Sequence, residues 1–244
     1  MLACNDVFRR YRTAGGSVEV LRGADLRVNG GEVAVILGPS GSGKSTLLHL
    51  LAGLDRPDAG EIWWDDFPVH EHTPSELAAR RALTIGLVFQ NHYLLDDLTV
   101  LENVLLPQRI SGKVDEERGR ALLERVGLSD RADFLPERIS GGEKQRAAVA
   151  RSLSLSPSFI IADEPTGSLD HARALDVFAL LLELAAEEGS GVVIVTHDET
   201  LLDVVTSADV GSQVLRLEDG ILTPDTVSVA RHIGEGNVSA DTVI

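Results

Sequence analysis

Apolar and polar positions along the chain predict a sheet of buried strands together with more exposed antiparallel ones. Residues 5–36 alternate polar and apolar side chains around turn signals, which predicts short antiparallel strands leading into a buried one. Residues 60–69 and 214–223 each predict a further hairpin, the second around Asp219-Gly220. Continuous apolar runs are typical of strands buried on both faces, and they occur at residues 33–37, 84–89, 159–162 and 192–196.

After the second apolar run the pattern changes to helical spacing. Thr99-x-x-Glu102 has the sequence of a capping box, and Asp115 can cap a second helix that Gly127 would close. Residues 91–138 are therefore expected to form a mainly helical insertion within an α/β framework. We expect one domain over residues 1–222, followed by a tail at 223–244 that could be loose or an edge strand.

Charge and composition narrow the classes of protein that the chain can represent. The net charge of −16 over 244 residues argues against a general nucleic-acid binder that relies on attraction to phosphates. No apolar run approaches the roughly 18–20 residues that span a bilayer. The single Cys4 permits no internal disulfide, in keeping with a cytoplasmic protein. We expect any membrane role to come through a partner.

The first buried run leads directly into a glycine loop that has the G-x-x-x-x-G-K-[ST] pattern. Strand, glycine loop and helix in that order are the context of a phosphate site, whereas a flexible linker would not lie between two apolar elements. Lys44 is expected to reach the β- and γ-phosphates, and the Ser45 hydroxyl to hold Mg²⁺. The predicted phosphate-binding residues are Gly38, Pro39, Ser40, Gly41, Ser42, Gly43, Lys44, Ser45 and Thr46.

Polar residues follow the other three buried runs at the carboxyl edge where ligands bind parallel sheets. They are Gln90, the pair Asp163-Glu164, and His197. A surface turn could hold two adjacent carboxylates, and a lone histidine is usually structural. A γ-phosphate shared by the glycine loop, Gln90, the acidic pair and His197 would explain why all four groups lie at this one edge. Asp163 is expected to contact Mg²⁺, Glu164 to deprotonate the attacking water, and Gln90 and His197 to position the water and contact the terminal phosphate.

A second anion site is predicted at the segment that begins with Ser140. Ser140 and Glu143 form a capping box, which by itself would explain a well-capped helix. Gly141 and Gly142 are poor helix formers, however, costing about 1 kcal/mol each against alanine. Close approach of the backbone to an anion would account for them.

Two further positions remain open between a structural and a binding role. Tyr11 could be a partly buried strand residue or an aromatic plate for an adenine ring. Asp170 is at least the N-cap of the helix that follows it.

Five motifs together resemble those of the ATP-binding cassette (ABC) transporter ATPases. They occur in the family's order as GPSGSGKST, the strand end at Gln90, ISGGEKQR, IIADEPTGSLD and VTHD, and the resemblance covers about residues 5–222. The segment FQNHYLLDDLTVLENVLLP resembles the lipoprotein-release and macrolide-export branch, which includes antimicrobial-peptide exporters and a division-associated cassette. Asp66 occupies the place of a turn glycine in this family, and aspartate tolerates a left-handed backbone.

The resemblance implies an α/β P-loop NTPase fold of ABC type, with ATP and Mg²⁺ as ligands and two molecules of ATP sandwiched in a head-to-tail homodimer. It places Ser140 and Gly142 on the γ-phosphate held by the partner's glycine loop, and Asp170 in contacts across the dimer. It makes Tyr11 the adenine-stacking aromatic and Glu164 the catalytic base. Gln90 joins Ser45 and Asp163 at the metal, and it links to the helical subdomain that meets a permease.

The function expected from this resemblance is an ATPase that powers a separate transmembrane permease, of an exporter or lipoprotein-release type. The protein would then lie on the inner face of the cell membrane through that permease. An alternative is an ATP-dependent regulatory partner of a membrane protein, with no transported substrate. A soluble cassette acting on DNA, ribosomes or cluster assembly is disfavoured, because the chain has no coiled coil, second cassette or basic patch.

Overall fold

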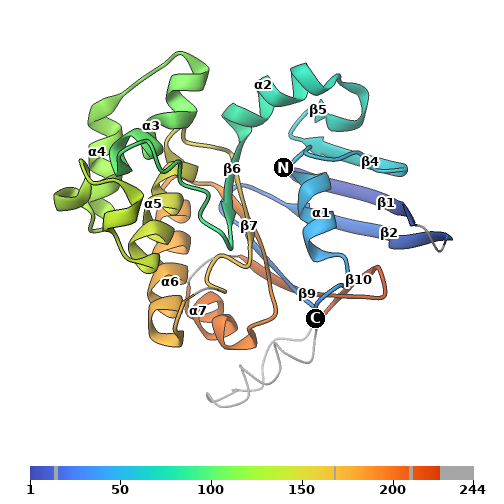
Figure 1. The fold of residues 1–244 in the computed structure, drawn as a ribbon. Coiled ribbons are helices and arrows are strands. Elements are labelled where there is room, and N and C mark those ends of the chain that lie inside the picture. Colours follow the sequence, from blue (N-terminus) through green and yellow to red (C-terminus); the bar gives the residue numbers. More distant parts are fainter. Residues whose placement is uncertain (14–15, 168, 209–210, 226–244) are drawn as a thin grey trace.

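The core of the molecule is a six-stranded sheet in which five neighbouring strands run parallel. The computed structural model describes residues 1–13, 16–167, 169–208 and 211–225. The strand order is β10-β9-β3-β8-β7-β6, with only β10 antiparallel to its neighbour (Figure 1). This confirms the mainly parallel core sheet. The strands are β3 (Val33–Leu37), β6 (Ile85–Phe89), β7 (Phe159–Asp163), β8 (Gly191–Thr196), β9 (Ser212–Glu218) and β10 (Ile221–Pro224).

A second, antiparallel sheet lies beside the core in the order β2-β1-β4-β5. Its strands are β1 (Leu2–Thr13), β2 (Gly16–Val28), β4 (Ala59–Trp64) and β5 (Phe67–Pro68). The antiparallel N-terminal subdomain is thus confirmed, but the expectation of short strands was wrong. β1 and β2 form one long ladder, whose register shifts between Cys4 and Val7 and again toward Arg10. These irregularities keep a long strand pair twisted against the core.

The turn between β4 and β5 has its left-handed residue one position earlier than expected. The left-handed residue there is Asp65, with φ of 54°, and not Asp66. The two tryptophans face opposite ways, as adjacent strand residues must. Trp64 is fully buried, and its indole N–H donates to the carbonyl of Leu51 at 2.7 Å, whereas Trp63 is half-buried at the surface.

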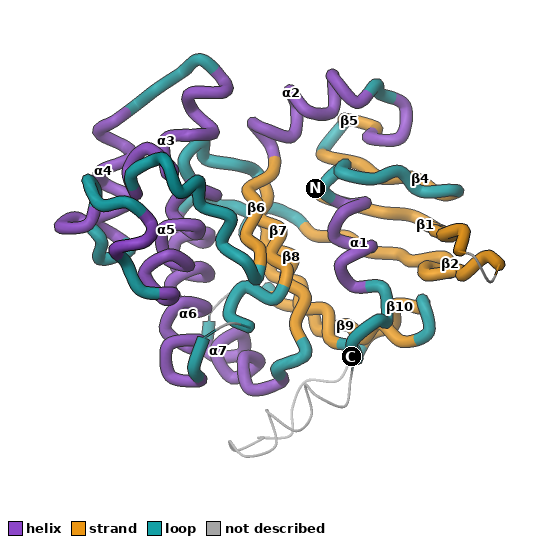
Figure 2. Tube along the Cα trace, in the orientation of Figure 1, coloured by secondary structure: helices purple, strands orange, loops and turns teal. Residues whose placement is uncertain are grey.

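The helices cover the two faces of the core sheet in two separate hydrophobic clusters. On one face, α1 (Lys44–Leu51) packs together with the antiparallel sheet. On the other, the helical insertion packs with α5 and α6, so that insertion and antiparallel sheet lie on opposite sides of the core strands (Figure 2). The other helices are α2 (Pro74–Thr84), α3 (Val100–Ser111), α4 (Glu116–Arg125), α5 (Gly141–Leu153), α6 (His171–Glu187) and α7 (Leu202–Ser207). Single 3₁₀ turns are η1 (Val69–Glu71), η2 (Ser129–Arg131), η3 (Pro136–Arg138) and η4 (Glu199–Leu201).

Local sequence signals set where these helices begin. Thr73, Thr99 and Ser140 each form a complete capping box at the start of α2, α3 and α5. The last strand, β10, extends two residues past the domain boundary expected at residue 222. The tail beyond Asp225 lies outside the described residues. Among the described helices, none has both the length and the apolar character needed to cross a bilayer.

Candidate active site

The register of the core sheet places four chain segments side by side at its carboxyl edge. Leu37 pairs with Thr196, Val195 pairs with Asp163, and Asp163 pairs with Phe89. The residues that follow these positions therefore emerge next to one another, although they are far apart in sequence. This alignment brings together the glycine loop, Gln90, the Asp163-Glu164 pair and His197.

These segments surround a cavity of about 650 Å³ that also reaches the antiparallel sheet. Most of the predicted nucleotide-contacting side chains line it, and β1 and β2 add one residue each. The lining residues are Tyr11, Val20, Ser40, Gly41, Gly43, Lys44, Ser45, Thr46, Gln90, Asp163, Glu164 and His197. Gly38, Pro39 and Ser42 of the same loop do not line it, and the Ser42 N–H donates to the Pro39 carbonyl at 3.2 Å.

Two glycines make the tight course of the loop possible. Gly43 has φ of 107°, and a Cβ built on it would lie 2.9 Å from the carbonyl oxygen of Val20. A Cβ on Gly38 would lie 2.4 Å from the carbonyl oxygen of Leu217. Any larger side chain at either place would push the loop off the sheet edge. No side chain caps α1, so the N–H groups of its first turn are left for an anion.

The Lys44 side chain is held against the backbone of the glycine loop. Its ammonium donates to the carbonyls of Gly38 at 2.8 Å and Pro39 at 3.1 Å. Its Nζ lies 4.0 Å from Oε1 of Glu164, and only 8% of the residue is exposed. The positive charge therefore already sits at the sheet edge, where it can exchange carbonyl partners for phosphate oxygens.

Glu164 occupies a strained and well-determined position just after β7. Its φ is 46°, a left-handed conformation that costs a non-glycine residue roughly 1–2 kcal/mol. Its N–H donates to the carbonyl of Val195 at 3.0 Å, and the Thr196 hydroxyl donates to Oε2 at 3.4 Å. Nδ1 of His197 lies 2.9 Å from both carboxylate oxygens. The surrounding groups thus fix the direction of the carboxylate, as strain at a functional site requires.

Asp163 and Ser45 form the pair of oxygen ligands that suits Mg²⁺. Ser45 and Asp163 both line the cavity, and the Ser45 hydroxyl is near enough to the Asp163 carboxylate to lower its pKa. Desolvation by burial raises the pKa of Asp163 above its ordinary value, and the Ser45 hydrogen bond opposes this only in part. A cation beside a carboxylate that is destabilised in this way stabilises its ionised form. Hard oxygen donors fit Mg²⁺, which takes its remaining ligands from phosphates and water.

The raised pKa of Asp163 makes a stability prediction. Because the folded chain disfavours the ionised form, stability contributed at this position falls as the pH rises through the folded-state pKa. We expect Asp163→Asn to raise the melting temperature of the nucleotide-free chain at about pH 7.5, and by progressively less as the pH is lowered through the folded-state pKa of Asp163. The same substitution should weaken Mg²⁺-dependent ATP binding. Asp130→Asn, an exposed control, should do neither. A lower melting temperature for Asp163→Asn at the higher pH would contradict this account.

The Ser140 segment lies apart from this cavity within one chain. Ser140 and Gly142 line a second cavity of about 410 Å³ that shares no lining residue with the first. The Ser140 hydroxyl accepts from the Glu143 N–H at 3.3 Å, and Arg131 pairs with Glu143 at 3.2 Å. Gly141 beside them is exposed, with nothing within 4 Å of a Cβ built on it.

Asp170 also lies apart from the first cavity. Its carboxylate caps α6 by accepting from the Arg173 N–H at 3.2 Å, so the structural role expected for it is confirmed. Like the Ser140 segment, it can meet a bound nucleotide only if another molecule brings one to it.

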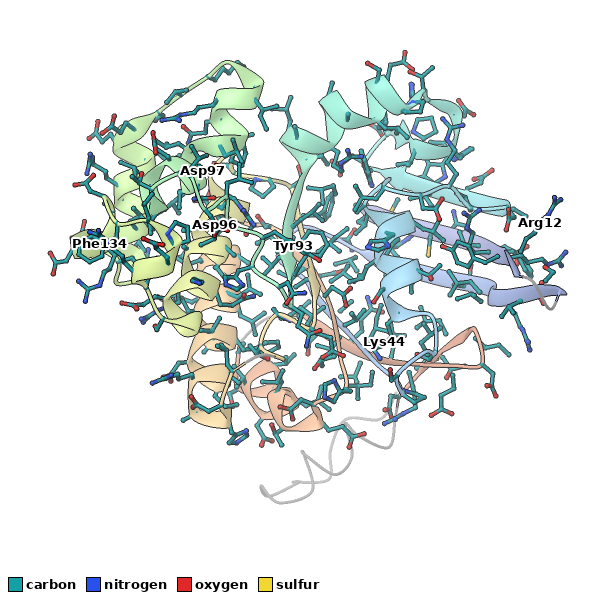
Figure 3. All side chains as sticks on the ribbon, in the orientation of Figure 1. Arg12, Lys44, Tyr93, Asp96, Asp97 and Phe134 are labelled. Carbon is teal, nitrogen blue, oxygen red and sulfur yellow. The ribbon has the colours of Figure 1, made fainter. Side chains whose placement is uncertain are left out.

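Sequence reasoning missed two residues that tie the site to the helical side of the molecule. The Gln145 amide, buried in α5, donates to the carbonyl of Phe89 at 3.1 Å, immediately before Gln90. The Arg151 guanidinium donates to the carbonyls of His92 and Tyr93 in the loop after β6, at 2.6 Å each (Figure 3 labels Tyr93). The available signal was a polar residue, Gln145, on the apolar stripe of a helix.

A glycine loop between a parallel strand and a helix, with an acidic pair on a neighbouring strand, defines a P-loop nucleotide-binding protein. The family model described as "ABC transporter" matches residues 21–167. The chain belongs to this family, and it is an ATP-binding subunit with the family's ATPase activity.

Known proteins named LolD are similar to this chain along nearly their whole length. The lipoprotein-releasing system ATP-binding protein LolD 1 of Rhodopirellula baltica is 46% identical over 206 residues, covering 83% of this chain and 90% of the relative. LolD of Idiomarina loihiensis is 40% identical, covering 91% and 96%. The chain also matches 32% of the macrolide export ATP-binding/permease protein MacB of Syntrophobacter fumaroxidans, at 39% identity over 94% of this chain.

A solved structure agrees with the fold. The dimeric ATP-binding cassette MJ0796, in a post-hydrolysis state bound to ADP and Pi, superposes with a TM-score of 0.81 at 34% identity. The match covers 91% of this chain and 96% of that one.

Proposed function

We propose that this chain powers a lipoprotein-release type of transport by hydrolysing ATP at the cavity described above, while a separate membrane permease moves the substrate. The convergence of the glycine loop, Gln90, Asp163-Glu164 and His197 in one cavity carries the proposal. The similarity to LolD proteins over most of both chains supports the type of system.

The residues of this cavity have different roles in ATP hydrolysis. The N–H groups of the glycine loop and the Lys44 ammonium hold the triphosphate, and Ser45, Asp163 and Gln90 provide the ligands for Mg²⁺. When bound, Mg²⁺ neutralises charge on the β- and γ-phosphate oxygens. Glu164 accepts a proton from the attacking water. His197 holds the Glu164 carboxylate in its direction and faces the terminal phosphate.

A head-to-tail dimer completes the site in this proposal. Each chain offers one cavity that contains the glycine loop and another that contains Ser140 and Gly142, so two chains can close over two nucleotides. The dimeric state of the similar cassette MJ0796 supports this arrangement. In the Glu164→Gln background we expect ATP with Mg²⁺ to convert the chain to a dimer in light scattering.

The matched pair Ser140→Arg and Ser129→Arg tests the dimer. Both replace an exposed serine of the helical side with the same large cation, but only Ser140 lies in the second cavity. Ser140→Arg should remain monomeric with ATP because its side chain would fill the place of the partner's phosphate, and Ser129→Arg should still dimerise. Dimers of Ser140→Arg would rule out this interface.

An apolar cavity next to Gln90 is the proposed docking surface for the permease. It has a volume of about 420 Å³ and lies between α2, β6, α3 and α5, with Phe89, Leu106 and Ile110 in its lining. It adjoins the end of β6, so a segment seated there could sense the position of Gln90. In the similar protein MacB, by its name, an ATP-binding part and a permease share one chain. Docking here would hold the chain on the inner face of the cell membrane.

Reconstitution tests the transport role against the regulatory one. The chain and the membrane protein that co-purifies with it would be placed in lipid vesicles containing a labelled lipoprotein. We expect ATP-dependent release of the lipoprotein with the wild-type chain and none with Glu164→Gln. ATP hydrolysis that responds to the membrane protein while no substrate moves would instead favour a regulatory partner.

A further inference from the structure

Tyr11 is held at the mouth of the nucleotide cavity by two charged residues to which nothing above gives a role. Its phenolic hydroxyl donates to Oδ2 of Asp55 at 2.9 Å. The Arg9 guanidinium lies over the Tyr11 ring, with Cζ 4.7 Å from the ring centroid. The same guanidinium donates to both oxygens of Asp55, at 2.9 and 2.8 Å. The three side chains form a closed triangle of contacts.

We propose that Arg9 and Asp55 are positioning residues that fix the Tyr11 ring as a stacking plate for the base of the nucleotide. This inference rests on the proposed role of Tyr11 in contacting the base. It adds that the plate is set in place before the nucleotide arrives, so that little freedom is lost when the base stacks.

The backbone explains why these particular residues meet. Arg9 and Tyr11 are two positions apart in β1, so their side chains leave the strand on the same face. Asp55 follows the end of α1, and its N–H donates to the carbonyl of His49 in that helix at 3.3 Å. The helix that presents its first turn to the phosphates is therefore tied at its other end to the strand that carries the aromatic ring. One rigid element sets the spacing between plate and phosphate loop.

The ring keeps one face available for a ligand. Tyr11 lines the 650 Å³ cavity together with the glycine loop, whereas Arg9 and Asp55 do not line it. Arg9 therefore covers the ring from the side away from the cavity, and the opposite face is open to a base. Tyr11 is 36% exposed, while the side chains of Arg9 and Asp55 are 19% and 32% exposed. An exposed ring held on one face and at its hydroxyl is suited to stacking an aromatic base.

Stacking recognises the flat face of a base and not its hydrogen-bonding edge. The clamp, by which we mean Arg9 and Asp55 together with the Tyr11 ring that they hold, should therefore favour nucleotides with large purine rings over the smaller pyrimidines. It should discriminate little between adenine and guanine. It should have no effect on a ligand that has phosphates but no base. A ligand without a base therefore distinguishes the contribution of the clamp from that of the phosphate site.

Binding of ATP and of inorganic tripolyphosphate, measured by calorimetry on the full chain with Mg²⁺, tests the proposal. Asp55→Ala and Tyr11→Phe each break the contact at the phenolic hydroxyl, and Tyr11→Phe removes a single oxygen from an exposed side chain. We expect both to raise the Kd for ATP about three- to tenfold and to leave the Kd for tripolyphosphate unchanged. Glu19→Gln, which breaks an ion pair of the neighbouring Arg10, is the matched control and should change neither.

Tyr11→Ala separates this inference from the proposed role of Tyr11 itself. If Tyr11→Ala weakens ATP binding while Asp55→Ala and Tyr11→Phe bind like the wild type, the ring contacts the base but the clamp has no role. If Tyr11→Ala also binds ATP normally, the base does not stack on Tyr11 and both ideas are wrong. An equal loss for ATP and tripolyphosphate in Asp55→Ala would show damage to α1 and would also overturn the clamp.

Discussion

Replacing Glu164 with glutamine is expected to lower ATP turnover by about 10²–10⁴-fold, the range contributed by a positioned general base. The change is isosteric, and the amide oxygen can still accept from the Thr196 hydroxyl, which lies 3.4 Å from Oε2 in the wild-type chain. The ability to take a proton from water is removed, together with the negative charge that faces Nδ1 of His197 and the Lys44 ammonium. Phosphate release measured at saturating ATP reports the turnover, and equilibrium binding should remain near that of the wild type.

Glu183→Gln provides the control for that substitution. Glu183 pairs with Arg125 at 3.0 Å on the exposed side of α6, far in the fold from the cavity, and the same chemical change there should leave turnover intact. A Glu164→Gln chain that hydrolyses ATP at a near-normal rate would exclude Glu164 as the base. The proton would then have to leave through another group of the cavity.

The Lys44→Ala substitution is expected to weaken ATP binding by about 10–100-fold, the loss of one charge-assisted hydrogen bond to phosphate. Lys44, labelled in Figure 3, is nearly buried, and its ammonium donates to the Gly38 carbonyl of the glycine loop. Alanine cannot supply this charge, and no other lysine lies in the cavity. A thermal shift titration checks this, because a ligand that binds only the folded chain stabilises it by an amount that grows with the logarithm of the ratio of ligand concentration to Kd.

Lys113→Ala is a matched control, since Lys113 is one of only three lysines in the chain and is exposed after α3. It should bind ATP like the wild type. Unchanged ATP affinity in Lys44→Ala would contradict the phosphate role of the glycine loop. Together the Glu164 and Lys44 substitutions separate the chemical step from binding, because one lowers turnover at saturation and the other raises the concentration of ATP required.

Element types in the core could be predicted well from local sequence, and the exceptions have identifiable causes. The buried strands and the capping boxes at Thr99 and Ser140 lie where the pattern indicates, because burial on both faces and N-cap hydrogen bonds leave clear signatures. The length of β1 and β2 was misjudged, because turn-forming residues within a strand also mark bulges. The hairpin with its turn at Asp219-Gly220 was predicted, but the sequence did not indicate that its first strand, β9, pairs with β3 in the parallel sheet.

Sequence by itself determined the motifs of this protein, which are a glycine loop of the G-x-x-x-x-G-K-[ST] pattern and an acidic pair after a buried strand, and through them the family to which the chain belongs. Such features are local, because a few adjacent residues must have the right types in the right order. Only the tertiary structure decided which groups meet. The register of β3, β8, β7 and β6 brings Glu164 to His197 and Lys44, and the end of α1 brings Asp55 to Tyr11. Contacts between distant segments follow from strand order and packing, which no short stretch of sequence contains.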